Sequence, residues 1–308
     1  PQRQELYKMS NLKTRNDASY YGGEPIWITA QKQGIKTGNI YWVGSDIAVK
    51  GQHPTYYHVY DQKPRLTQTE RVAEALRMLK LPEEERPQLV MIYFEDSDTY
   101  GHTYSPHSKE TRRCVEELDA LMKYLWEGLQ SLPFGKDINL IVTLSQMDYI
   151  FVPVSADRFV PIKHLLNEKW YTLIDGNLPA QIYTKPEYRD SVYQALQGLN
   201  HVRVWKKEDI PAYLNYGSNP RVGDIIVLPD LGWLVEEGNK TLPGAHGFDP
   251  TYDDMQVMFR ACGPDFKKRY EAPKFRNVSI YSLLARLLHI TPEKTDGCLE
   301  EVENMLIQ

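Results

Sequence analysis

Short apolar stretches alternate with amphipathic stretches along the first half of the chain. Residues 39–43, 89–94 and 138–144 are rich in aliphatic and β-branched side chains, and polar or proline-containing turns bound each stretch. These patterns predict buried strands. Residues 67–81 and 108–132 instead repeat their apolar positions at helical spacing. Strands that alternate with helices favour an α/β fold with a mostly parallel sheet covered on both faces.

The two predicted helices carry further local signals. Thr67 and Glu70 are spaced as a capping box, and Pro82 follows the last apolar position of that helix. The stretch at 108–132 presents an apolar stripe that includes Leu118, Leu125 and Leu129. Because it is long enough to span back across a sheet, we expect it to join strands 89–94 and 138–144 as parallel neighbours.

The second half of the chain has a different pattern. Residues 180–184, 202–205, 224–228 and 232–236 read as strands, and residues 188–199 as a helix. We expect these to form an α+β lobe inserted at about 165–240 into a single domain that covers residues 1–308. A strand at 255–261 and an amphipathic helix at 278–290 then return the chain to the main sheet.

Composition narrows the class of protein. With 308 residues, 42% hydrophobic and 25% charged, the chain matches folded globular proteins rather than disordered ones. Its net charge of -5 argues against a nucleic-acid duplex as partner. Its apolar runs are far shorter than a membrane span. Three cysteines without Cys-x-x-Cys spacing support neither a disulfide framework nor a thiolate zinc site.

Candidate metal ligands follow the predicted strand at 89–94. The sequence YFEDSDTYGH at residues 93–102 places Asp98 and His102 in a predicted loop, where Gly101 would allow a tight turn. Ligands collect at the carboxyl ends of strands in open α/β sheets, and carboxylate and imidazole both bind zinc. The alternative is that Asp98 caps the next segment and His102 is a solvated loop residue.

A second candidate is His246, which lies between glycines in GAHGFD at residues 244–249. Taken alone, a histidine in a turn is more often exposed to solvent than bound to metal. Together, Asp98, His102 and His246 make a set of three ligands of the kind that catalytic zinc sites use, with a coordination position left for water or substrate.

At these motifs the chain resembles the nucleotide pyrophosphatase/phosphodiesterase family (type I phosphodiesterases) of the alkaline phosphatase superfamily. The resemblance extends over nearly the whole chain and rests on an ordered series of segments: YYGGEPIW at 20–27, YWVGSD at 41–46, LPEEERP at 81–87, residues 93–106, WYTLID at 170–175 and GAHGFD at 244–249. It implies an alkaline-phosphatase-like sheet sandwiched by helices. It also implies that Asp98, His102 and His246 form one of two zinc sites.

The same resemblance implies a nucleobase pocket. Tyr60 and Tyr93 match aromatic residues that stack on the base, and Trp42 and Asp46 match positions near that pocket. Stacking on aromatic faces tolerates different bases. Without the resemblance, the three aromatic residues would be interpreted as core residues.

The sequence departs from the family pattern in the second zinc site. The family's threonine nucleophile and a metal-binding aspartate match positions before Pro1, so we expect no nucleophile in these residues and a core without its N-terminal part. The family's Asp-His-Gly-Met element is replaced by Ser145, Gln146 and Met147. Asp148 is a candidate substitute ligand, although ordinary loop polarity explains it as well.

The resemblance implies hydrolysis of phosphodiester or pyrophosphate bonds in a small nucleotide-like substrate, by a covalent threonine and two zinc ions. With one zinc site kept, we expect impaired catalysis. Two alternatives stay open: a noncatalytic homologue that binds nucleotides or a protein, and a phosphomonoesterase or lipid-head-group phosphodiesterase of the same superfamily. The family implies an extracellular or periplasmic location.

Overall fold

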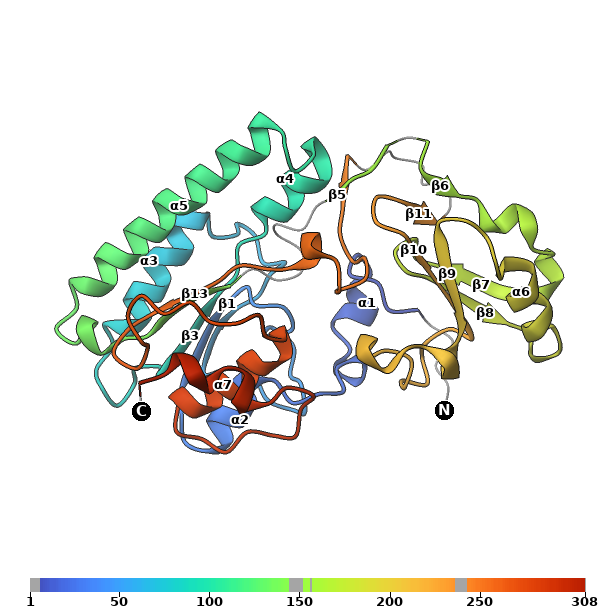
Figure 1. Ribbon diagram of the computed structural model, residues 1–308. Helices are drawn as coiled ribbons and strands as arrows, with labels where there is room; N and C mark the ends of the chain where they lie inside the picture. The colour runs from blue at the N-terminus through green and yellow to red at the C-terminus, as the bar shows by residue number, and fades with distance from the viewer. Residues whose placement is uncertain (1–5, 144–151, 156, 236–242, 308) are drawn as a thin grey trace. The chain divides into compact units, whose positions relative to one another are not determined.

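Three parallel strands form the sheet of the N-terminal region, in the order β2-β1-β3. They are β1 (Thr37–Ile40), β2 (Tyr56–His58) and β3 (Leu89–Ile92). The computed structural model describes residues 6–143, 152–155, 157–235 and 243–307 (Figure 1). Strand β1 ends earlier than the sequence predicts because Tyr41 takes a left-handed backbone conformation, with φ of 59°. The parallel pairing confirms the expected α/β class.

Helices cover both faces of this sheet. On one face, α3 (Gln68–Leu79) and α5 (Lys109–Gln130) bury a cluster that includes Val72, Leu125 and Leu129, against which Ile92 of β3 packs. On the other face, α2 (Ile26–Lys32) and α7 (Ile280–Leu287) pack with Met91. Because successive residues of a strand point to opposite faces, Met91 and Ile92 link β3 to both layers.

Local signals in the sequence explain these helices. Helix α3 begins with the predicted capping box, in which Thr67 Oγ1 accepts from the Glu70 backbone and the Glu70 carboxylate accepts from the Thr67 backbone. Helix α3 also approaches β1 closely, since a Cβ on Gly38 would lie 2.7 Å from Met78 Sδ. Glycine at that position therefore lets the helix pack against the sheet.

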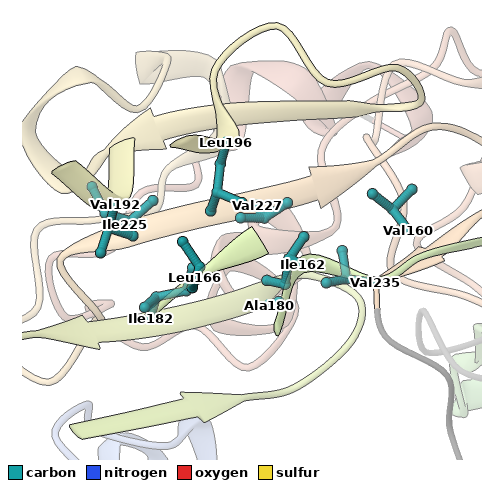
Figure 2. Packing of buried hydrophobic residues seen from close by; sticks show 10 residues of the cluster. All are labelled: Val160, Ile162, Leu166, Ala180, Ile182, Val192, Leu196, Ile225, Val227 and Val235. Atoms are coloured by element: carbon teal, nitrogen blue, oxygen red, sulfur yellow. The ribbon is translucent and has the colours of Figure 1, made fainter. Parts of the chain in front are cut away.

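An antiparallel sheet dominates the second half of the chain. Its order is β7-β8-β10-β9, formed by β7 (Tyr171–Asp175), β8 (Ala180–Thr184), β10 (Ile225–Pro229) and β9 (Val202–Lys206). Helix α6 (Arg189–Leu196) contributes Val192 and Leu196 to the buried cluster beneath it, as Figure 2 shows. The strands and helix confirm the predicted α+β pattern; the inserted lobe of a single domain stays a prediction.

The chain folds into two compact units. The first comprises Pro1–Phe94, Leu118–Ile141 and Ala261–Gln308, and the second comprises Glu95–Glu117 and Val142–Arg260. Short elements of the chain include α1 (Leu12–Arg15), β5 (Val152–Pro153), β6 (Phe159–Val160), β11 (Leu234–Val235) and β12 (Gly244–Ala245). Within the described ranges, no helix combines the length and hydropathy needed to cross a bilayer.

Two expectations from the sequence are wrong. Strand β4 (Leu140–Thr143) pairs with β13 (Phe259–Cys262), whereas β3 pairs with β1, so β3 and β4 are not the predicted neighbours among the described residues. Leu140 and Ile92 nevertheless pack against the same cluster under α3 and α5, which is why the two strands share one hydrophobic pattern. Residues 96–104, expected as a loop, form helix α4 (Asp96–Tyr104).

Candidate metal centre

Helix α4 positions two of the three predicted ligands. It follows Glu95 as N-cap residue, and Asp96 and Asp98 lie in its first turn, where acidic side chains interact favourably with the helix dipole. Residues four apart lie on the same face of a helix, so Asp98 and His102 point the same way. The helical conformation therefore brings Asp98 and His102 to the same side, an effect that was expected from a tight turn at Gly101.

A backbone carbonyl orients His102. Its Nδ1 lies 3.0 Å from the carbonyl oxygen of Gly244. Since a carbonyl can only accept, this hydrogen bond places the proton on Nδ1 and leaves a lone pair on Nε2. Imidazole ligands of metals are usually held in this way by an acceptor on the second ring nitrogen.

The third candidate ligand, His246, comes from the segment after β12. This strand pairs with β5 through Gly244 opposite Pro153 and Ala245 opposite Val152. After His246 the chain turns at Gly247, whose φ is 100° and whose added Cβ would lie 3.3 Å from the Leu178 carbonyl oxygen. The next side chain, Phe248, is buried. Glycine at 247 therefore allows His246 to face the site while Phe248 enters the core.

The structure brings the three side chains together. Nε2 of His102 lies 3.2 Å from Nε2 of His246, and the Asp98 Oδ1 atom lies 3.6 Å and 3.3 Å from these two nitrogens. Ligand atoms of a tetrahedral zinc site with Zn–N distances near 2.05 Å are about 3.3 Å apart. The three measured separations match that spacing.

The donor chemistry fits a divalent cation as well. In the metal-free chain, His246 Nε2–H can donate to His102 Nε2. No such hydrogen bond satisfies Asp98 Oδ1, which is buried and without a hydrogen-bond partner. An unsatisfied buried carboxylate oxygen is costly unless a cation compensates it. The arrangement can therefore hold one metal ion through a carboxylate and two imidazoles.

The residues assigned to a nucleobase pocket lie in the first unit. Asp46 Oδ2 accepts from the Tyr60 backbone N–H at 3.1 Å. The Tyr60 ring meets Tyr41 edge to face at 5.7 Å, and the Arg65 guanidinium lies over it at 4.6 Å. The structure thus brings Asp46 and Tyr60 together.

Tyr93 and Trp42 are held by other contacts. Tyr93 follows β3, and its carbonyl oxygen accepts from Arg71 Nη1 at 2.8 Å. Trp42 is half-buried against the cluster of α2 and α7. Ser145, Gln146 and Met147, which replace the family's Asp-His-Gly-Met element, and the candidate substitute ligand Asp148 lie outside the described residues.

The buried carboxylate of Asp249, near the third ligand, was not among the site residues predicted from the sequence. Asp249 is 1% exposed and accepts four hydrogen bonds, from Arg203, Tyr213 and the backbone and hydroxyl of Thr251. Burial alone would raise the pKa of Asp249, but hydrogen bonds from Thr251, Tyr213 and Arg203 outweigh it and hold that pKa well below its usual range. The signal that could have identified Asp249 from the sequence was its place in GAHGFD, three residues after His246.

Known proteins share both the sequence pattern and the fold. Residues 1–249 match the family model "Type I phosphodiesterase / nucleotide pyrophosphatase". The chain is 29% identical to venom phosphodiesterase CdcPDE of Crotalus durissus collilineatus over 97% of its length, and it spans 37% of that relative. It is 30% identical to the human ectonucleotide pyrophosphatase/phosphodiesterase family member 5, covering 99% of this chain and 63% of the relative.

A solved structure gives the same relationship. The structure of murine ectonucleotide pyrophosphatase/phosphodiesterase 5 superposes with a TM-score of 0.87 at 30% identity, covering 95% of this chain and 78% of that one. A second structure of the murine protein is described as an inactive variant in complex with AMP. Sequence and fold therefore identify the same group of relatives.

Proposed function

Because the chain belongs to the type I phosphodiesterase / nucleotide pyrophosphatase family, within the alkaline phosphatase superfamily, we propose that it acts on phosphodiester or pyrophosphate bonds of small nucleotides. The observation that carries the proposal is the convergence of Asp98, His102 and His246, whose ligand atoms lie within 4.8 Å of one another. Such a set supports binding of a divalent cation, and its mixture of oxygen and nitrogen ligands favours zinc.

Each residue of this set has a separate task. Asp98 supplies the negative charge, and the two imidazoles supply neutral nitrogen ligands. The Gly244 carbonyl fixes the orientation of His102. A zinc ion held there supplies Lewis-acid stabilisation of charge on a phosphoryl oxygen.

We propose the nucleobase-binding role for Trp42, Asp46, Tyr60 and Tyr93. The family pattern supports this assignment, and the complex of the murine relative with AMP supports a nucleotide as the kind of ligand. The contact of Asp46 with the Tyr60 backbone would hold the Tyr60 ring in place. Names such as venom phosphodiesterase and ectonucleotide pyrophosphatase support an extracellular or periplasmic location.

Catalytic competence depends on the second zinc site of the family mechanism. Ser145, Gln146 and Met147 stand where the family pattern has its Asp-His pair. Since two cations act together on the attacking and leaving oxygens, losing one typically costs several orders of magnitude in rate. We therefore propose slow hydrolysis by this chain. The same residues favour a second candidate function, nucleotide binding without turnover.

Turnover of the nitrophenyl ester of thymidine monophosphate tests these proposals. The 308-residue chain, with zinc in excess, should hydrolyse it several orders of magnitude more slowly than an intact relative that cleaves this ester. A chelator or Asp98→Asn should abolish this turnover, while Asp96→Asn in the same helical turn should not.

The outcomes separate the candidates. Turnover that resists both the chelator and Asp98→Asn contradicts the cation site. Rates equal to the relative contradict slow hydrolysis and the loss of the second site. Absent turnover with measurable AMP binding supports the binding function, and absence of both contradicts the proposed function altogether.

A further inference from the structure

An ion pair fixes the segment that carries His246 to a strand far away in the sequence. Arg203 of β9 donates from Nη1 to Asp249 Oδ2 at 2.6 Å. Tyr213, from the 3₁₀ helix Ala212–Leu214, donates its hydroxyl to the same oxygen at 2.5 Å. Asp249 is three residues from His246, so both contacts act on the chain just beyond the ligand.

The segment is also held on the other side of His246. Strand β12 pairs with β5, and the Gly244 carbonyl accepts from His102. Only Gly247 and Phe248 separate His246 from Asp249. His246 therefore lies between two points at which the chain is held: the pairing of β12 with β5 and the contacts of Asp249. The position of its ring depends on both.

The buried Asp249 carboxylate depends on Arg203 for compensation of its charge. Asp249 is 1% exposed, and burying a carboxylate is costly unless it is paired and hydrogen-bonded. The Nε and Nη2 atoms of Arg203 are buried without hydrogen-bond partners. The guanidinium bonds Asp249 through Nη1 and also interacts with the Tyr213 side chain. Loss of Arg203 would deprive the buried Asp249 carboxylate of this cation, whereas the Arg203 side chain is 35% exposed and would keep access to solvent if Asp249 were lost.

We infer that Arg203 and Asp249 are positioning residues for the candidate metal centre, which hold His246 at its distance of 3.2 Å from His102. This inference rests on the proposed cation site. Neither residue contacts the ligand atoms, and both act through the backbone of residues 246–249. Outer residues that orient metal ligands typically contribute 10- to 100-fold to metal affinity.

Titration of the metal-free chain with Co²⁺ tests the inference, because cobalt absorbance reports both affinity and coordination geometry. We expect Arg203→Gln to raise the Kd for Co²⁺ by roughly 10-fold or more and to alter the visible spectrum. Arg203→Lys keeps the charge and should recover part of the affinity. Lys206→Gln is the matched control: it lies on the same strand and breaks the ion pair with Asp190 instead.

A second variant covers the case in which Arg203→Gln fails to fold. Tyr213 is 49% exposed, so Tyr213→Phe removes a single hydrogen bond to Asp249 with little effect on packing. It should raise the Kd less than Arg203→Gln does. The melting temperature of each metal-free variant distinguishes positioning from general stability, since a merely structural role would lower it without changing the Kd or the spectrum.

Two results would overturn the inference, and they distinguish a wrong positioning role from a wrong cation site. If His102→Ala weakens cobalt binding while Arg203→Gln and Tyr213→Phe leave it unchanged, the cation site stands and the positioning role is wrong. If the unsubstituted chain and His102→Ala behave alike in the titration, the proposed cation site is wrong, and the positioning role falls with it.

Discussion

Helix α4 and the segment at residues 244–249 hold ligands of the same candidate centre by different means. In α4, a single helical turn aligns Asp98 with His102, and the backbone hydrogen bonds of that turn are local. The segment with His246 has no helix or extended strand of its own beyond β12. Its position depends on β5, on Arg203 of β9 and on Tyr213.

The two regions differ in whether local or tertiary interactions determine the position of the ligand. A spacing of four residues is visible in the sequence and is sufficient once the helix forms. The position of His246 instead requires tertiary contacts with residues 33 to 94 positions away, at Tyr213 and Val152 respectively. We expect the helical pair to respond to backbone changes within the helix, and His246 to respond to changes at a distance.

The largest effect should come from breaking the helical turn itself. Thr99 is exposed, and its backbone N–H donates to the Glu95 carbonyl at 3.2 Å. Thr99→Pro removes that bond and should destabilise α4 by about 3 kcal/mol. Zinc affinity should fall sharply, as measured by competition with a chelator. Thr99→Ala is the control, and equal zinc affinity in both variants would mean that the helix does not align the ligands.

Gly247→Ala tests the second region at the turn after His246. The added methyl group meets a φ of 100° and the Leu178 carbonyl at 3.3 Å. Residues forced into such conformations cost about 1–3 kcal/mol, and urea denaturation measures this loss. Gly22→Ala should cost little because its Cβ has no neighbour within 4 Å. A Gly247 variant as stable as the Gly22 variant would contradict the role of this turn.

A pH-dependent effect is expected at Asp249. Its pKa is lowered in the folded chain, so its carboxylate contributes stability above the unfolded pKa of about 4, and this contribution disappears as the pH falls through the folded pKa. Asp249→Asn should therefore be less stable than the unsubstituted chain by about 1–3 kcal/mol at pH 7. Urea denaturation at pH 7 and pH 3 should show this difference shrinking in acid. A difference independent of pH would contradict the charged network.

Local patterns predicted several of the longer helices and strands. The capping box at Thr67 and Glu70 fixed the start of α3, and the apolar stripe predicted α5 to within a few residues. The pairing of β4 with β13 was not predictable, because strand partners depend on contacts between distant segments rather than on the hydrophobicity of either strand. The helical conformation of residues 96–104 was also missed, since Gly101 suggested a turn.

The candidate metal centre was likewise only partly predictable from the sequence. Asp98, His102 and His246 could be selected as potential ligands from residue type and family pattern. Their contact across 144 positions, between His102 and His246, needed the fold. Arg203 was not identifiable from sequence, because a charged residue on a strand has no visible role until its partner Asp249 is known.

Zinc content of the purified chain tests whether Asp98, His102 and His246 bind a metal ion. After dialysis against zinc and then against buffer, the unsubstituted chain should retain zinc, and His102→Ala should lose nearly all of it. His107→Ala is the matched control, since His107 is exposed and lies outside the set of Asp98, His102 and His246. We predict that the His107 variant keeps its zinc. Equal zinc content in the unsubstituted chain and the His102 variant would contradict the account.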